Sequence, residues 1–79
     1  GWDVKKKENK IYFLEKKFIF KNFIDSQKFV NQVGNIAEAQ GHHPDIIFGW
    51  GYATIQIFTH KIAGLVESDF ILAAKIDKI

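Results

Sequence analysis

Residues 22–41 read NFIDSQKFVNQVGNIAEAQG, and this stretch decides the fold of the chain. Its first residue, an asparagine, can cap a helix, and an acidic residue follows three positions later, as at many helix starts. Apolar side chains then recur at helical spacing and form a single stripe, made of Phe29, Val30, Val33, Ile36 and Ala37. Gly41 supplies the stop, because glycine adopts left-handed backbone geometry at little cost. We therefore predict a helix that starts near Asn22, ends at Gly41 and buries one face.

The residues before this helix predict a β-hairpin. Trp2 to Val4 is short and alternates apolar with polar side chains, and Lys5 to Lys10 is a charged segment that contains Asn9, as a turn does. Ile11 to Phe20 alternates in the manner of a half-buried strand, and the side chains that mark it are Leu14, Phe18 and Phe20. The three consecutive lysines at 5–7 are expected at the solvated end of the hairpin.

The residues after the helix predict a second strand pair and a final helix. The strands are Asp45 to Trp50 and Ala53 to Thr59, on either side of Gly51. One face of the second strand holds Ala53, Ile55 and Ile57, and the other holds Thr54, Gln56, Phe58 and His60. The final helix runs from about Glu67 to the end of the chain, and its buried side is expected to hold Leu72, Ile76 and Ile79. The order β-β-α-β-β-α predicts an α+β fold, in which two helices pack on one face of a four-stranded antiparallel sheet.

Length and composition limit what this chain does. Residues 1–79 are expected to form a single small domain, whose core alone contributes about 3–5 kcal/mol, so assembly is a natural source of further stability. The net charge is 11 − 9 = +2, and all the basic residues are lysines. Because arginine makes the bidentate contacts to DNA bases, we do not expect direct nucleic-acid binding. The first residue is not methionine, so the chain is processed or is part of a longer reading frame.

The chain has no cysteine, which excludes disulfides and thiolate metal sites. Its apolar runs are too short to span a membrane, and it shows no signal-peptide pattern. We therefore expect a cytoplasmic protein with no membrane partner.

Chemistry near neutral pH is expected at the histidines, of which the chain has three: His42, His43 and His60. His43 precedes a proline and so favours extended backbone, which points neighbouring side chains to opposite sides. We therefore predict different functions for His42 and His43. A three-histidine zinc site is the main alternative, but adjacent ligands that diverge give poor coordination geometry, and metal binding is not expected.

Two carboxylates accompany these histidines. Asp69 lies in the first turn of the final helix, where the helix dipole favours a negative charge, and its carboxylate could also orient a histidine and set its tautomer. Glu38 lies in the last turn of the first helix, where the dipole disfavours it. Its carboxylate is either solvated or accepts paired N–H bonds from a flat amino-heterocycle.

The spacing of these residues resembles the signature of the pterin-4a-carbinolamine dehydratase family. The matching pattern is Glu38-x3-His42-His43-Pro44, then Trp50, His60 and Asp69, together with Thr59-His60-x3-Gly64-Leu65-x3-Asp69. The similarity extends over almost the whole chain. A His-His-Pro sequence alone would be a weak signal, whereas the complete set at these spacings is a specific one.

The resemblance implies a function and a role for each site residue. Members of this family dehydrate 4a-hydroxytetrahydropterin to quinonoid dihydropterin and so recycle the tetrahydrobiopterin used by aromatic amino-acid hydroxylases. On this basis His42 and His60 are the expected acid and base, and His43 is a third catalytic residue that mainly positions the pterin. Glu38, Thr59 and Asp69 are expected to bind substrate or support the site. The pterin is the substrate, and no metal or redox cofactor is expected.

The resemblance also implies partners and an alternative. Relatives pair their edge strands, so a homodimer or homotetramer is expected. Other relatives are dimerisation cofactors, transcriptional coactivators or assembly factors, so a non-catalytic interaction module is the alternative function. Three departures from the family pattern stand out. The usual N-terminal helix is not within residues 1–79, Gly41 replaces an acidic residue of some relatives, and Val66 stands where relatives often have a capping Ser or Thr. Valine cannot cap, so the start of the last helix is expected to be shifted or weaker.

Overall fold

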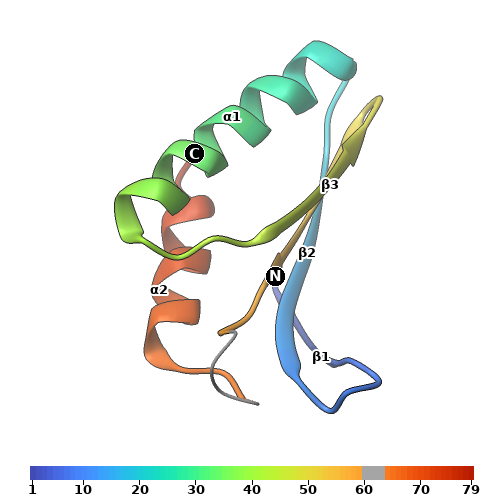
Figure 1. Ribbon diagram of the computed structural model, residues 1–79. Helices are drawn as coiled ribbons and strands as arrows, with labels where there is room; N and C mark the ends of the chain where they lie inside the picture. Colours follow the sequence, from blue (N-terminus) through green and yellow to red (C-terminus); the bar gives the residue numbers. More distant parts are fainter. Residues whose placement is uncertain (60–63) are drawn as a thin grey trace.

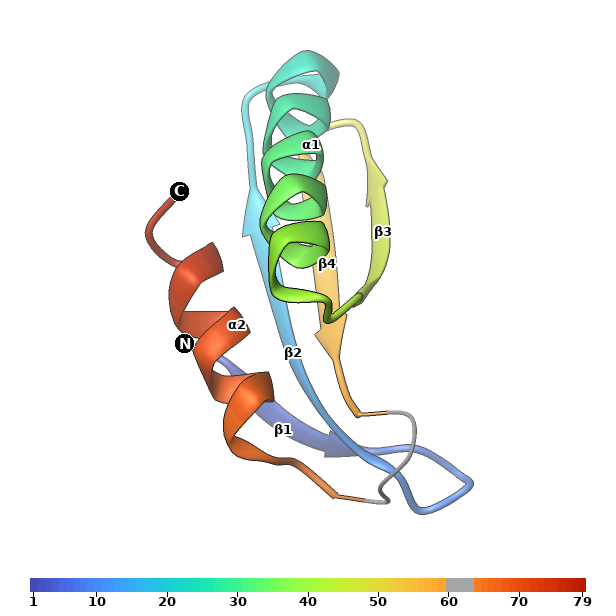
Figure 2. The same cartoon turned by 60° about the vertical axis from the view of Figure 1, so that its left-hand side comes forward.

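The computed structural model describes residues 1–59 and 64–79 and confirms the predicted fold class and order of elements. Its helices and strands are β1 (Asp3–Lys6), β2 (Tyr12–Ile19), α1 (Phe23–Gln40), β3 (Asp45–Gly49), β4 (Tyr52–Ile57) and α2 (Glu67–Ile76). All neighbouring strands are antiparallel, and their order in the sheet is β1-β2-β4-β3. Both helices lie on one face of this sheet, as Figures 1 and 2 show.

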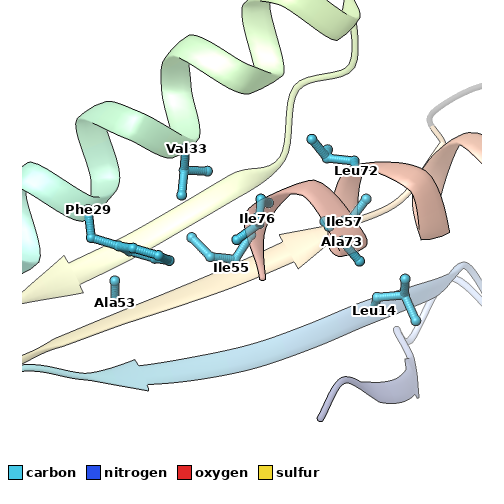
Figure 3. Close-up of a cluster of buried hydrophobic side chains, with 9 residues drawn as sticks. All are labelled: Leu14, Phe29, Val33, Ala53, Ile55, Ile57, Leu72, Ala73 and Ile76. Atoms are coloured by element: carbon cyan, nitrogen blue, oxygen red, sulfur yellow. The ribbon is translucent and has the colours of Figure 1, made fainter. Parts of the chain in front are cut away.

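The core lies between the two helices and the central strands. Antiparallel pairing of β2 with β4 sets Leu14 opposite Ile57, so both side chains project to the helical side of the sheet. From α1, Phe29 and Val33 pack down onto β4, and α2 closes the other end of the core (Figure 3). The buried cluster consists of Leu14, Phe29, Val33, Ala53, Ile55, Ile57, Leu72, Ala73 and Ile76. The predicted apolar stripe of the first helix and the predicted inner face of β4 are thus confirmed.

Helix α1 begins and ends where its sequence predicts. The side chain of Asn22 accepts a hydrogen bond of 2.8 Å from the backbone N–H of Asp25, and this bond caps the helix start. Gly41 takes left-handed geometry, with φ of 63° and ψ of 29°. The backbone N–H of Gly41 donates to Glu38, and that of His42 donates to Ala37, the pair of bonds that defines a Schellman stop. The helix end therefore fixes the position from which His42 projects.

Several predictions about the ends of elements are wrong. Trp50 lies in the turn after β3, and Phe58 and Thr59 follow the end of β4. Lys5 and Lys6 belong to β1 and pair with Phe13 and Tyr12, so the turn is confined to residues 7–10. Lysine is tolerated there because β1 is an edge strand, whose side chains reach solvent. Ile79 is exposed and not buried, because α2 ends at Ile76 and the last residues leave the helical stripe.

The two ends of the chain meet at Asp77. The Trp2 indole N–H donates to one carboxylate oxygen over 3.0 Å, and the Lys16 ammonium donates to the other over 2.8 Å. Partial burial acts to raise the pKa of Asp77, but the hydrogen bonds from Lys16 and Trp2 outweigh it, so this pKa lies below its usual value. These bonds fasten β1, β2 and the end of α2 together.

No helix in the described part of the chain is both long enough and apolar enough to cross a membrane.

Candidate active site

The carboxylate of Asp69 is the centre of the candidate site. The residue is completely buried, and its oxygens contact groups from three separate segments. Oδ1 lies 2.6 Å from Nε2 of His42, which follows α1. The hydroxyl of Thr59, just after β4, lies 3.0 Å from both oxygens, and the backbone N–H of Val66 donates to Oδ2 over 2.8 Å. Asp69 thus joins the end of α1, the end of β4 and the start of α2.

The bond from Val66 to Asp69 also explains how α2 starts. Val66 has no side chain that could cap the helix, yet α2 begins at Glu67 as the sequence predicts. The cap comes from the third residue of the helix, because the Asp69 side chain accepts the N–H of Val66, and the N–H of Asp69 donates back to the Val66 carbonyl. The expected shift of this helix start is therefore not seen, and a carboxylate inside the first turn takes part in the cap.

His42 and His43 have different partners and different exposures. The side chain of His42 is only 18% exposed and contacts buried Asp69, whereas that of His43 is 63% exposed. Nε2 of His43 lies 2.7 Å from Oε1 of Glu38, whose side chain is itself 80% exposed. The expectation that these neighbouring histidines point to different sides agrees with this geometry. Glu38 lies off the apolar stripe of α1, as predicted.

One described residue of the sequence pattern, Trp50, is not part of this cluster. Trp50 is 72% exposed and follows β3, so the whole length of that strand separates it from His43. His60 lies outside the described residues, and its predicted position at the site therefore stays a prediction. Among residues 1–59 and 64–79 there is no group of three or more histidine or acidic side chains that could hold a metal ion.

The backbone N–H of Val66 also belongs to the site, although the sequence analysis considered only side chains and did not predict it. The spacing between Val66 and Asp69 could have predicted it. The side chain of an acidic residue three positions after a helix cap often accepts a hydrogen bond from the backbone N–H of the cap residue. The hydroxyl of Thr59 contacts Asp69, and the predicted role of Thr59 in substrate binding stays a prediction. In the described part of the chain, the candidate site holds one buried histidine–carboxylate pair, His42 with Asp69, and one exposed pair, His43 with Glu38.

The chain is a small α+β domain whose fold matches solved structures of the pterin dehydratase class. The chain belongs to the pterin 4 alpha carbinolamine dehydratase family, whose sequence profile matches residues 1–79.

Related sequences agree with this assignment. A protein of Rubrobacter xylanophilus is 53% identical over 79 residues, which are the whole of this chain and 70% of that relative. A protein of Halorhodospira halophila is 59% identical over 64 residues, which are 81% of this chain and 59% of that relative. Both relatives are named provisionally as pterin-4-alpha-carbinolamine dehydratases. The matched region thus spans about three fifths to seven tenths of the length of these relatives.

Two solved structures share the fold. The crystal structure of a transcriptional coactivator/pterin dehydratase from Brucella melitensis aligns with a TM-score of 0.81 at 25% identity, over 95% of this chain and 79% of that one. A pterin dehydratase-like protein identified as a RuBisCO assembly factor in the alpha-carboxysome aligns with a TM-score of 0.82 at 26% identity. That alignment covers 99% of this chain and 87% of the other. The same fold therefore occurs in proteins with different described roles.

Proposed function

We propose that this chain is a cytoplasmic 4a-hydroxytetrahydrobiopterin dehydratase, a hydro-lyase that eliminates water from 4a-hydroxytetrahydropterin to give quinonoid dihydropterin. The observation that carries this proposal is the contact of 2.6 Å between Nε2 of His42 and buried Asp69, in a chain that belongs to the dehydratase family. An imidazole held by a buried carboxylate is a suitable group for proton transfer near neutral pH.

The reaction requires one acid and one base. The bond from C4a to its hydroxyl oxygen breaks, and because hydroxide is a poor leaving group, an acid must protonate that oxygen so that it departs as water. A base removes the proton from N5, and the electron pair left on N5 forms the double bond to C4a. We assign His42 to one of these proton transfers, and the family resemblance assigns His60 to the other. The reaction is not expected to need a metal or redox cofactor, since no electrons are gained or lost.

The exposed pair suits substrate binding. His43 and Glu38 present an imidazole and a carboxylate beside each other at the end of α1, where both reach solvent. A carboxylate can accept two N–H bonds from the amino-pyrimidine part of a pterin, and an imidazole can donate to or accept from its carbonyl and ring nitrogens. We therefore place pterin binding mainly at His43 and Glu38, and proton transfer at His42.

The test is the rate at which the 4a-carbinolamine disappears, followed by stopped-flow spectroscopy with the spontaneous reaction subtracted. His42→Ala and His60→Ala should each lower the enzymatic rate about 10²–10⁴-fold, the usual effect of losing a general acid or base. A matched control is Lys28→Ala, because Lys28 is an exposed residue of α1 outside the site, and this variant should keep the wild-type rate. If the His42→Ala/His60→Ala double variant is as fast as the wild type, the acid–base assignment is wrong.

A non-catalytic interaction module is the second candidate function. It is favoured by the structural similarity to a protein identified as a RuBisCO assembly factor, and by the name of the Brucella structure as a transcriptional coactivator/pterin dehydratase. Large apolar side chains are also exposed at one end of the sheet, among them Ile19 and Trp50. A wild-type protein that binds no pterin and does not accelerate dehydration would favour this second function.

We also propose that the chain forms a homodimer or homotetramer through an edge of its sheet. The two edge strands differ, because β1 carries Lys5 and Lys6, which oppose pairing with another chain, whereas β3 carries exposed Ile47 and a single charged residue, Asp45. Edge β3 is therefore the better candidate for pairing with a second copy. Sedimentation velocity at micromolar concentration should show a dimer or larger species, and a monomer alone would contradict this.

A further inference from the structure

The buried carboxylate of Asp69 has a donor for each of its oxygens. Oδ1 is shared by His42 and Thr59, and Oδ2 is shared by Thr59 and the backbone N–H of Val66. An ionised carboxylate only accepts hydrogen bonds, so each of these neighbours must supply a proton. The backbone N–H always does so, and the Thr59 hydroxyl can.

The same requirement applies to His42 and determines its tautomer. Nε2 lies 2.6 Å from Oδ1, so Nε2 must carry the hydrogen, and in the neutral ring Nδ1 then carries the lone pair. No hydrogen bond joins Nδ1 to any residue in the described part of the chain. In that same part, no fully buried side-chain nitrogen or oxygen lacks a partner, so Nδ1 is not fully buried. We infer that it is the atom of His42 that meets the substrate.

Thr59 is the neighbour of Asp69 that contacts both carboxylate oxygens. It lies two residues after the end of β4, a central strand, and its hydroxyl is 3.0 Å from both oxygens of Asp69. A single O–H directed between two carboxylate oxygens opposes rotation of the carboxylate group. Without it, Oδ1 would keep only His42 as a partner, and the carboxylate could turn away from the imidazole.

We propose that Thr59 is a positioning residue: through buried Asp69 it holds His42 as the Nε2–H tautomer, so that His42 exchanges protons with its substrate through Nδ1. The effect on rate rests on the proposed dehydration, whereas the effect on the tautomer does not. In either direction of transfer, Nδ1 is the atom that gains or loses the proton. The charge of the resulting imidazolium is then stabilised by Asp69 through Nε2.

The decisive measurement is the tautomer of His42 in protein labelled with ¹⁵N-histidine, because the ¹⁵N shifts of the two ring nitrogens distinguish the tautomers. The chain has three histidines, so His43→Gln and His60→Gln variants assign the signals. At a pH where the ring is neutral, wild-type His42 should be mainly Nε2–H. Thr59→Val, which keeps the branched shape and removes the hydroxyl, should increase the Nδ1–H form, and Thr59→Ser should restore the wild-type state.

The kinetic measurement uses the same variants. Thr59→Val should lower kcat about tenfold, with a smaller change in KM, by analogy with the about 10–100-fold cost of losing a partner that orients a metal-bound histidine. Thr59→Ser should recover most of that loss. The matched control is Thr54→Val, because Thr54 lies on β4 between buried Ala53 and Ile55 and so projects to the face of the sheet away from the helices. This control should change neither the tautomer nor kcat.

The outcomes separate this proposal from the proposed function. A wild-type His42 that is mainly Nδ1–H, or a folded Thr59→Val variant with unchanged tautomer and kcat, would overturn the role of Thr59. If wild-type protein does not accelerate dehydration, the proposed function fails, and the ¹⁵N measurement still decides the tautomer. If Thr59→Val does not fold, Asp69→Asn replaces it. Asparagine can turn its amide towards the imidazole, so the Nδ1–H form should increase, and an unchanged tautomer would overturn the proposal.

Discussion

The two histidine–carboxylate pairs of this protein begin at neighbouring histidines. They have nearly the same nitrogen-to-oxygen distance but differ in burial, in sequence separation and in their other partners. His42 lies 2.6 Å from Asp69, and His43 lies 2.7 Å from Glu38. The first pair is largely buried, joins residues distant in the sequence and shares its carboxylate with Thr59 and Val66. The second pair is exposed to solvent, and its residues are close in sequence at one end of α1. The distance between the two partners therefore does not by itself show how much a pair contributes to the stability of the fold.

Whether a pair is buried or exposed to solvent determines its contribution to stability. Exposed ion pairs contribute about 0–1 kcal/mol, because water screens the charges and both side chains must be ordered. Removing one partner of a buried network costs more, since the groups left behind have no access to water. We therefore expect the Asp69 pair to stabilise the fold and hold a proton-transfer group, and the Glu38 pair to leave His43 free to meet a ligand.

The largest expected effect is on stability. Asp69→Ala should lower the free energy of unfolding by about 3 kcal/mol, because His42, Thr59 and the N–H of Val66 all lose a buried acceptor and α2 loses its cap. Urea denaturation measures this change.

Glu38→Ala is the matched carboxylate deletion, and it should change the free energy of unfolding by less than about 0.5 kcal/mol, as is usual for surface substitutions. Equal losses in the two variants would show that burial does not distinguish the pairs.

A smaller effect is expected on binding at the exposed pair. His43→Ala should raise the KM for the carbinolamine about tenfold, roughly the loss of one hydrogen bond to the ligand, and should change kcat by less than about threefold. Stopped-flow rates over a range of substrate concentrations separate the two quantities. A kcat that falls as far as in His42→Ala, with unchanged KM, would mean that both histidines take part in the chemical step.

The sequence predicted the fold well where the determinants are local. The cap at Asn22, the apolar stripe and the stop at Gly41 act within one helix, so spacing alone located α1. Prediction was weaker where contacts between distant residues determine the secondary structure. The charge of Lys5 and Lys6 suggested a turn, but pairing with β2 makes them part of β1. Ile79 fits a helical stripe in the sequence but lies after the end of α2.

The site was predictable as a set of residues but not as a set of contacts. His42 and Asp69 are 27 positions apart, and no local pattern states which histidine an acidic residue will meet. Folding of the helix ends and β4 onto one another decides this pairing, and it also directs Thr59 to the carboxylate. Trp50 belongs to the sequence pattern, yet the pattern does not state that this side chain is exposed in the turn after β3.

The bonds at Asp77 make the two ends of the chain depend on each other. Trp2 and Lys16, from the first hairpin, both donate to this single carboxylate, which lies just after α2. Removal of the last three residues, for example by a protease, would therefore also release the indole of Trp2, which packs edge-on against Phe18 at a ring separation of 6.0 Å. Loss of Asp77 would thus loosen both the residues just before β1 and the end of α2.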